Sequence, residues 1–171
     1  LRDGDDPGDA AVYEKTPQLA QASIGQNDVS ATPLQMAMVA AAVRNDGVVM
    51  QPYLVESVRS ADLQVLSQTR PSQLSLATSS ANAAKLRQMM VGVVQSGTGW
   101  RAQVAGVTVG GKTGTANSDN VRTPYAWFIA WADNPDVAIC VFVQDAEIAA
   151  TDVAGGRVAA PIAKSVIEAL R

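Results

Sequence analysis

Three strand-like segments follow one another in the second half of the chain, and they constrain its fold more than any other feature. Residues 108–116, 126–132 and 137–144 are rich in valine, isoleucine, aromatic residues and glycine. Only Asp133-Asn134-Pro135-Asp136 separates the second segment from the third, and these residue types favour a tight turn. The sequence therefore predicts an antiparallel meander in which 126–132 pairs with both of the other segments.

Helical patterns precede these strands. Thr32-Pro33 predicts a helix start, because threonine is a good N-cap and proline is accepted in the first turn, and Gly47 predicts the end of that helix. A second helix, capped by Ser79 or Ser80, is expected to run to about Val94. Its predicted apolar face consists of Leu86, Met89, Met90 and Val93.

A last helix is expected after Gly155-Gly156, long enough to cover the sheet. Short strands are expected at 48–50 and 54–58, and irregular polar chain at 60–79. Helices that cover an antiparallel sheet define an α+β fold, in which 108–116 is an edge strand. The helix residues predicted to lie on one face, against the sheet, are Ile162, Val166, Ala169 and Leu170.

The first residues differ in composition from the rest. Four aspartates among glycine and proline predict an acidic flexible segment over residues 1–22, followed by the folded portion over 23–171. These aspartates lack the glycine and the terminal glutamate of an EF-hand loop, so they do not predict a calcium site. Because the chain begins at Leu1 rather than methionine, we expect it to be a piece of a longer protein.

The composition excludes several kinds of chemistry. The 171 residues include no histidine, which removes Ser-His-Asp triads, Cys-His dyads and histidine-bearing metal sites. Cys140 lies in an apolar strand and is expected to be buried and unreactive. The net charge is −3 without a basic run, so no nucleic-acid partner is expected. A reaction must therefore use lysine, hydroxyls, carboxylates or backbone amides.

The segment Gly111-Lys112-Thr113-Gly114-Thr115-Ala116 combines one lysine and two hydroxyls with glycines. In a strand, Lys112 and Gly114 share one face while Thr113 and Thr115 share the other. The unpaired edge of such a strand can bind an extended peptide, and a lysine beside hydroxyls can hold a carboxylate. The alternative is an ordinary twisted strand with a solvated lysine.

This segment resembles the Lys-Thr-Gly signature of the penicillin-recognising serine enzymes. Other passages, in the same order and spacing, resemble class B penicillin-binding proteins, most of all the actinobacterial penicillin-binding protein A group. The resemblance covers residues 22 to 171, and the fold it implies is the C-terminal part of the serine transpeptidase domain. The matching passages are Gly25-Gln26, Thr32-Pro33-Leu34-Gln35-Met36-Ala37, Asn45-Asp46-Gly47, Gly97-Thr98-Gly99 and Trp127-Phe128-Ile129-Ala130.

The resemblance also implies roles for the strand residues. Lys112 would assist proton transfer, and Thr113, Gly114 and Thr115 would bind the substrate. The two threonine hydroxyls would hold the terminal carboxylate, and the backbone N–H of Thr115 would form half of an oxyanion hole. The implied activity is peptidoglycan DD-transpeptidation through a serine acyl-enzyme, without metal or organic cofactor.

The implied partners are stem peptides, β-lactam antibiotics, the upstream half of the same domain, and cell-wall synthesis or division proteins. The implied location is the outer face of the cytoplasmic membrane, with the anchor upstream. Two alternatives stay open: a β-lactamase or β-lactam sensor with the same fold, and a non-catalytic interaction domain.

One departure from the family concerns the nucleophile. No serine of this chain has a lysine three positions later, so the family's Ser-x-x-Lys motif is absent and is expected upstream of Leu1. Ser80-Ala81-Asn82 matches the middle motif, Ser-x-Asn, but it follows the Thr-Pro-Leu-Gln passage instead of preceding it. We interpret Ser80 as a helix cap. Asp145 and Glu147 are interpreted as solvated loop residues, and Trp100, Trp127 and Trp131 as core anchors.

Overall fold

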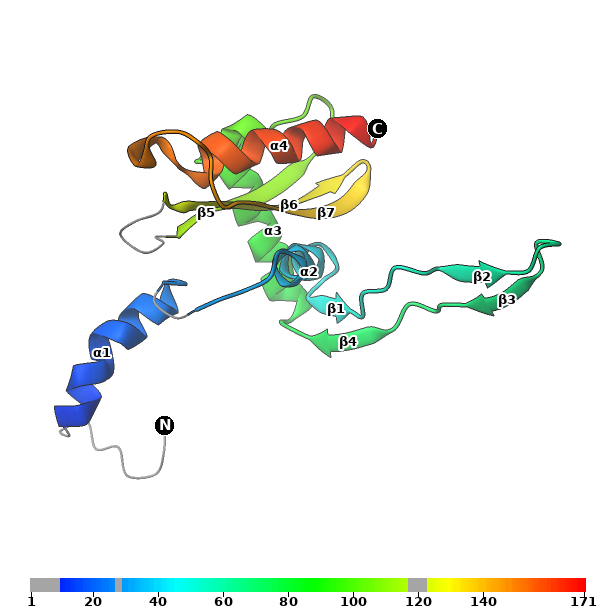
Figure 1. Ribbon diagram of the computed structural model, residues 1–171, viewed down its shortest axis with the longest axis horizontal. Helices are drawn as coiled ribbons and strands as arrows, with labels where there is room; N and C mark the ends of the chain where they lie inside the picture. Colours follow the sequence, from blue (N-terminus) through cyan, green and yellow to red (C-terminus); the bar gives the residue numbers. More distant parts are fainter. Residues whose placement is uncertain (1–9, 27–28, 117–122) are drawn as a thin grey trace.

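The computed structural model describes residues 10–26, 29–116 and 123–171. A three-stranded antiparallel sheet lies between α4 on one face and α2 on the other, while a long arm and the helix α1 extend away from it (Figure 1). The elements in chain order are α1 (Ala10–Ser23), α2 (Pro33–Arg44), β1 (Val48–Met50), β2 (Ser57–Arg59), β3 (Val65–Gln68), β4 (Gln73–Leu76), α3 (Ser80–Gln95), η1 (Trp100–Ala102), β5 (Val109–Ala116), β6 (Tyr125–Asp133), β7 (Asp136–Val143), η2 (Ala150–Asp152) and α4 (Gly155–Ala169).

The central sheet has the predicted order, β5-β6-β7, so β5 is an edge strand. Lys112 lies opposite Ile129, which in turn lies opposite Cys140. Because side chains alternate along a strand, these three share one face, and Ile129 packs there against a cluster that includes Val43 of α2. Phe128, on the other face, belongs to the larger core with α4. The antiparallel meander and the α+β class are confirmed.

Helix α4 covers the sheet with a different face from the one predicted. Ile162, Val166 and Leu170 are 44%, 40% and 54% exposed. Two lines of apolar residues on α4 each repeat every four residues. Helical periodicity alone therefore cannot show which line faces the sheet. The helix uses the line with smaller side chains, which brings its backbone closer to the sheet. The buried residues of this line are Ala159, Ala160, Ala163 and Ile167.

Helix α2 begins and ends as predicted. Thr32 and Gln35 form a capping box, and Gly47 has a φ of 88° at the turn into β1. A β-carbon on Gly47 would lie 2.1 Å from the carbonyl oxygen of Thr78, so this position also requires a residue without a side chain. Arg87 of α3 joins the two helices: it donates to the carbonyl of Val43 at 3.0 Å and forms an ion pair with Asp46 at 2.9 Å.

Helix α3 begins at the first of its two predicted caps, which corrects the interpretation of Ser80 as the cap, and its buried face differs from the prediction. The N-cap is Ser79, whose hydroxyl accepts a hydrogen bond from the N–H of Asn82 at 3.3 Å, and Ser80 is the first helical residue. Of the predicted face, Met90 is buried, whereas Leu86 and Met89 are 37% and 60% exposed. The helix packs through an adjacent line of residues that has the same helical period. That line consists of Ala83, Met90 and Val94.

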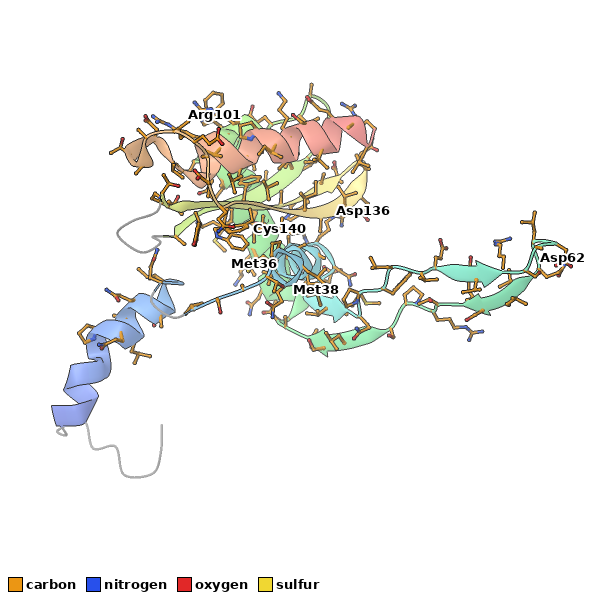
Figure 2. All side chains as sticks on the ribbon, viewed as in Figure 1. Met36, Met38, Asp62, Arg101, Asp136 and Cys140 are labelled. Carbon is orange, nitrogen blue, oxygen red and sulfur yellow. The ribbon has the colours of Figure 1, made fainter. Side chains whose placement is uncertain are left out.

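The arm corrects the expectation of irregular chain at 60–79. It contains β3 and β4, which pair with β2 and β1 in two antiparallel ribbons, and Figure 2 shows Asp62 at its tip. β3 and β4 are exposed along their whole length. β4, Gln73-Leu74-Ser75-Leu76, does alternate polar and apolar residues, but each strand has only four residues, at the lower limit of the run over which alternation indicates a strand. The expected strand 54–58 is likewise displaced, to β2.

Part of the segment expected to be flexible, residues 1–22, is described by the structure. Flexible chain is predicted there, whereas the structure forms α1 from Ala10, with Pro17 inside the helix. The acidic composition that motivates the prediction belongs to Asp3, Asp5, Asp6 and Asp9, which lie outside the described residues. The alanine-rich sequence after them favours a helix.

We expect Ser79→Ala to lower the free energy of unfolding by about 1 kcal/mol, because it removes the side-chain cap of α3. The matched control is Ser80→Ala, which leaves the cap intact and is expected to change stability by less than about 0.5 kcal/mol. Urea denaturation of the two variants measures both values. Equal losses, or a larger loss for Ser80→Ala, would contradict the assignment of the cap to Ser79.

Candidate active site

The outer edge of β5 carries backbone groups that pair with no other strand of the described residues. The carbonyl oxygen of Thr115 accepts a hydrogen bond from Nε2 of Gln26 at 3.3 Å, so it points away from β6. In a strand the N–H and C=O of one residue point to the same side, so the N–H of Thr115 also faces the open edge. Thr115 itself is exposed. Within residues 10–26, 29–116 and 123–171 no strand pairs with this side of β5, so the expected edge strand with Thr115 at an opening is confirmed.

Lys112 lies on the α2 side of this edge. Its side chain is exposed, and its Nζ donates to the carbonyl of Thr113 at 2.6 Å. A hollow of about 670 Å³ opens beside it, with aromatic rings from β6 and β7 on its floor. A cation at the rim of an apolar hollow can attract and hold an anionic group more strongly than a lysine surrounded by water. The residues that line the floor are Tyr125, Trp127, Ile129 and Phe142.

The two threonine hydroxyls lie on the opposite face of β5, as the alternation predicts. The hydroxyl oxygens of Thr113 and Thr98 are 2.8 Å apart. The hydroxyl of Thr115 accepts a hydrogen bond from the N–H of Gly155, the first residue of α4, at 3.4 Å. The structure therefore brings Lys112, Thr113 and Thr115 to one strand edge, with lysine and hydroxyls on different sides of it.

Sequence reasoning from the strand alone misses three neighbours of the site. Thr98, Gly155 and Gln26 contact β5 residues from 15, 40 and 89 positions away in the chain. Glycines in the sequence could have indicated two of these neighbours, Thr98 and Gly155. Gly155-Gly156 and the glycines on either side of Thr98 are typical of places where two backbones meet closely.

Glycines along β5 leave space on both faces of the strand, and large side chains of β6 occupy that space. A β-carbon on Gly110 would lie 2.4 Å from the ring of Trp131, and one on Gly111 would lie 2.4 Å from the ring of Phe128. Real atoms do not approach so closely. The glycines of this strand therefore serve packing, and Lys112 is held in a fixed register opposite Ile129.

Other candidate residues stand apart from β5. Ser80 begins α3, whereas the loop carrying Thr98 follows the other end of this 16-residue helix, about 24 Å away at 1.5 Å per residue. Cys140 faces α2 (Figure 2), and burial raises the pKa of its thiol, which disfavours the thiolate. Trp131 is buried as predicted, but Trp100 is 53% exposed, so its assignment as a core anchor is wrong.

No group of three potential metal ligands occurs in the described part of the chain. Among those same residues, none of the helices has the length and apolar character needed to cross a membrane.

Comparison with known proteins identifies the family. The model of the penicillin-binding protein transpeptidase domain matches residues 3–168, and the chain belongs to this family. It is 46% identical over 158 residues to peptidoglycan D,D-transpeptidase PbpA of Mycolicibacterium smegmatis, covering 88% of this chain and 31% of that protein. PbpA of Mycobacterium tuberculosis is 43% identical, again over 88% of the chain and 31% of the relative. The chain therefore spans about a third of these curated relatives.

Solved structures give the same result for the fold. Penicillin-binding protein A of M. tuberculosis, as the ceftriaxone acyl-enzyme complex, matches with a TM-score of 0.81 and 39% identity, over 89% of this chain and 35% of that one. The penicillin G acyl-enzyme complex of that protein matches with a TM-score of 0.78 and 41% identity, over 90% and 35%. The resemblance to class B penicillin-binding proteins of actinobacteria is confirmed, as is the transpeptidase fold.

We expect Gly111→Ala to destabilise the protein by about 1–3 kcal/mol, because the new methyl group must displace the fully buried ring of Phe128. Gly92→Ala is the control. Nothing lies within 4 Å of a β-carbon at Gly92, and alanine there should stabilise α3 by up to about 1 kcal/mol. Thermal and urea denaturation compare the two, and a neutral Gly111→Ala would contradict the packing role of this glycine.

Proposed function

We propose that this chain forms the Lys-Thr-Gly wall of a peptidoglycan DD-transpeptidase site whose serine nucleophile lies on a segment N-terminal to it. The observation that carries the proposal is the free edge of β5, where Lys112, Thr113 and Thr115 lie together in a chain of the transpeptidase family. In the reaction, the serine attacks the D-Ala-D-Ala amide, D-Ala leaves, and the amine of a neighbouring stem peptide attacks the acyl-enzyme.

Lys112 is assigned to proton transfer and electrostatics. Its ammonium lies at the rim of the hollow on the α2 side, where its bond to the Thr113 carbonyl can be exchanged for bonds to incoming hydroxyls. A positive charge at this point favours a deprotonated serine and stabilises negative charge that develops on the substrate.

The edge of β5 is assigned to substrate binding. The hydroxyls of Thr113 and Thr115 hold the terminal carboxylate, and Gly114 between them lets the peptide approach the backbone. The N–H of Thr115, directed outward, is assigned to the oxyanion hole. Loss of one such donor typically costs about 2.7–4 kcal/mol of activation free energy.

The same site accounts for the proposed ligands. A β-lactam carries a strained amide and a carboxylate in the relative positions of the D-Ala-D-Ala terminus, so it can use the same groups of β5. The relatives solved as ceftriaxone and penicillin G acyl-enzymes support β-lactam binding. We place the protein on the outer face of the cytoplasmic membrane, where stem peptides are cross-linked.

We expect a fluorescent penicillin to label the complete transpeptidase, meaning the longer polypeptide proposed to contain this chain, but not this chain alone. The reason is that the chain holds no Ser-x-x-Lys motif to supply an activated serine. Denaturing electrophoresis shows a covalent adduct directly. A labelled band from the isolated chain would show that a nucleophile lies within it, and an unlabelled complete protein would overturn the proposed function.

In the complete transpeptidase, Lys112→Ala should slow acylation by at least about 10²-fold while the protein stays folded, since the variant loses general acid–base and electrostatic assistance. Lys164→Ala is a matched control, because Lys164 is a partly exposed lysine of α4 that lies 3.8 Å from Glu168. Stopped-flow acylation rates compare the two. If both variants acylate at the wild-type rate, Lys112 is an ordinary solvated lysine.

A further inference from the structure

The hydroxyls of Thr113 and Thr115 each meet one partner from behind β5. For Thr115 the direction of the hydrogen bond is fixed, because the N–H of Gly155 can only donate. The hydroxyl oxygen is thus the acceptor, and its own proton is left for another group. This proton points to a ligand that accepts hydrogen bonds, such as a carboxylate.

The partner of Thr115 is the start of a 15-residue helix. Its N-cap residue, Ala154, supplies no side-chain hydrogen bond, and the hydroxyl of Thr115 accepts from Gly155, one of the N–H groups of the first turn that have no partner within the helix. The helix N-terminus carries a partial positive charge, which polarises this hydroxyl toward donation. Gly155 must be glycine here, because its β-carbon would lie 2.2 Å from the Trp127 carbonyl oxygen.

The partner of Thr113 is Thr98, in the loop after α3, which the backbone holds firmly. The N–H groups on both sides of Thr98, those of Gly97 and Gly99, donate to the same carbonyl, that of Val93, at 3.1 and 3.0 Å. On the other side α4 packs against Thr98, where a β-carbon on Gly156 would lie 2.0 Å from the Thr98 carbonyl oxygen. The position of the Thr98 hydroxyl is therefore set by two helices.

We propose that Thr98 is a positioning residue, which donates its hydroxyl proton to Thr113 so that Thr113 and Thr115 both direct their protons at the ligand's carboxylate. Either hydroxyl of the Thr98–Thr113 pair can be the donor when no ligand is present. A carboxylate only accepts, so its binding selects the arrangement in which Thr98 donates to Thr113 and Thr113 donates outward. Hydrogen bonds aligned in such a chain strengthen one another.

This inference rests on the proposed function, and its test uses a ratio of two rates. The complete transpeptidase is acylated by penicillin G and, separately, by penicillin G methyl ester, in which the negative charge is absent. Thr98→Val keeps the shape of the side chain but cannot donate. We expect it to lower the acid-to-ester ratio of acylation rates by about tenfold, the usual scale for one hydrogen bond that acts on a charged group.

Two further variants complete the experiment. Thr98→Ser, which restores a donor, should bring the ratio back to within about twofold of wild type. Ser96→Ala is the control from the same loop, because the Ser96 hydroxyl bonds to the carbonyl of Gly92 and not to β5. It should leave the ratio unchanged. A partly unfolded variant loses both rates equally, so its ratio still reports on Thr98.

The outcomes separate the two proposals. If the wild type prefers the acid and Thr98→Val keeps that preference, the positioning role of Thr98 is overturned while the proposed function stands. A Thr98→Ser variant as impaired as Thr98→Val would also overturn it, since packing and not donation would then be the cause. If the wild type is acylated by neither compound, the proposed function fails, and this inference fails with it.

Discussion

The close contact of backbone with backbone and with aromatic rings around β5 is the constraint on which the rest of this structure depends. At Gly110 and Gly111 the rings of Trp131 and Phe128 occupy the space where a side chain would stand. At Gly155 the first turn of α4 touches β5 and β6 directly. The sheet is thus clamped on both faces, although after Val109, at the start of the strand, no bulky residue of β5 enters either core.

This packing explains why the edge of β5 is available for a ligand. Because close packing around the glycines holds the strand, Lys112, Thr113 and Thr115 carry little of the core. Their polar groups make only a few hydrogen bonds within the chain and lie at the edge, where a ligand can reach them. Thr98 and Gly155 belong to segments that already pack on the sheet. They bond to the hydroxyls of Thr113 and Thr115, which lie on the same face of β5. The stability of the domain and the geometry of its proposed site therefore have the same origin.

Much of the fold can be predicted from local signals. The turn at Asp133–Asp136, the cap at Thr32 and the alternation at Lys112 and Thr113 each depend on a few neighbouring residues, and the structure agrees with them. The order of the sheet follows from short connections. The role of β5 as an edge strand then follows from this order.

The errors arise where two solutions satisfy the same local pattern. Two lines of residues on α4 and two on α3 share one helical period, and only the space available against the sheet decides between them. Strands β3 and β4 of the arm have four residues each, so the alternation present in β4 is too short to distinguish a strand from irregular chain. The contacts of Thr98, Gly155 and Gln26 with β5 join distant segments. Such contacts depend on how whole elements pack, which no short window of sequence contains.

The path of the arm has a consequence for how this protein can vary. The chain leaves the domain through β1 and returns through β4, which pair side by side, and Arg87 independently ties α3 to the end of α2. The separation of the two helices is therefore set at the base of the arm and is independent of how many residues lie beyond it. The arm can be lengthened, shortened or opened at its tip while the sheet and its edge keep their geometry, which makes it a natural place for insertions and for fused domains.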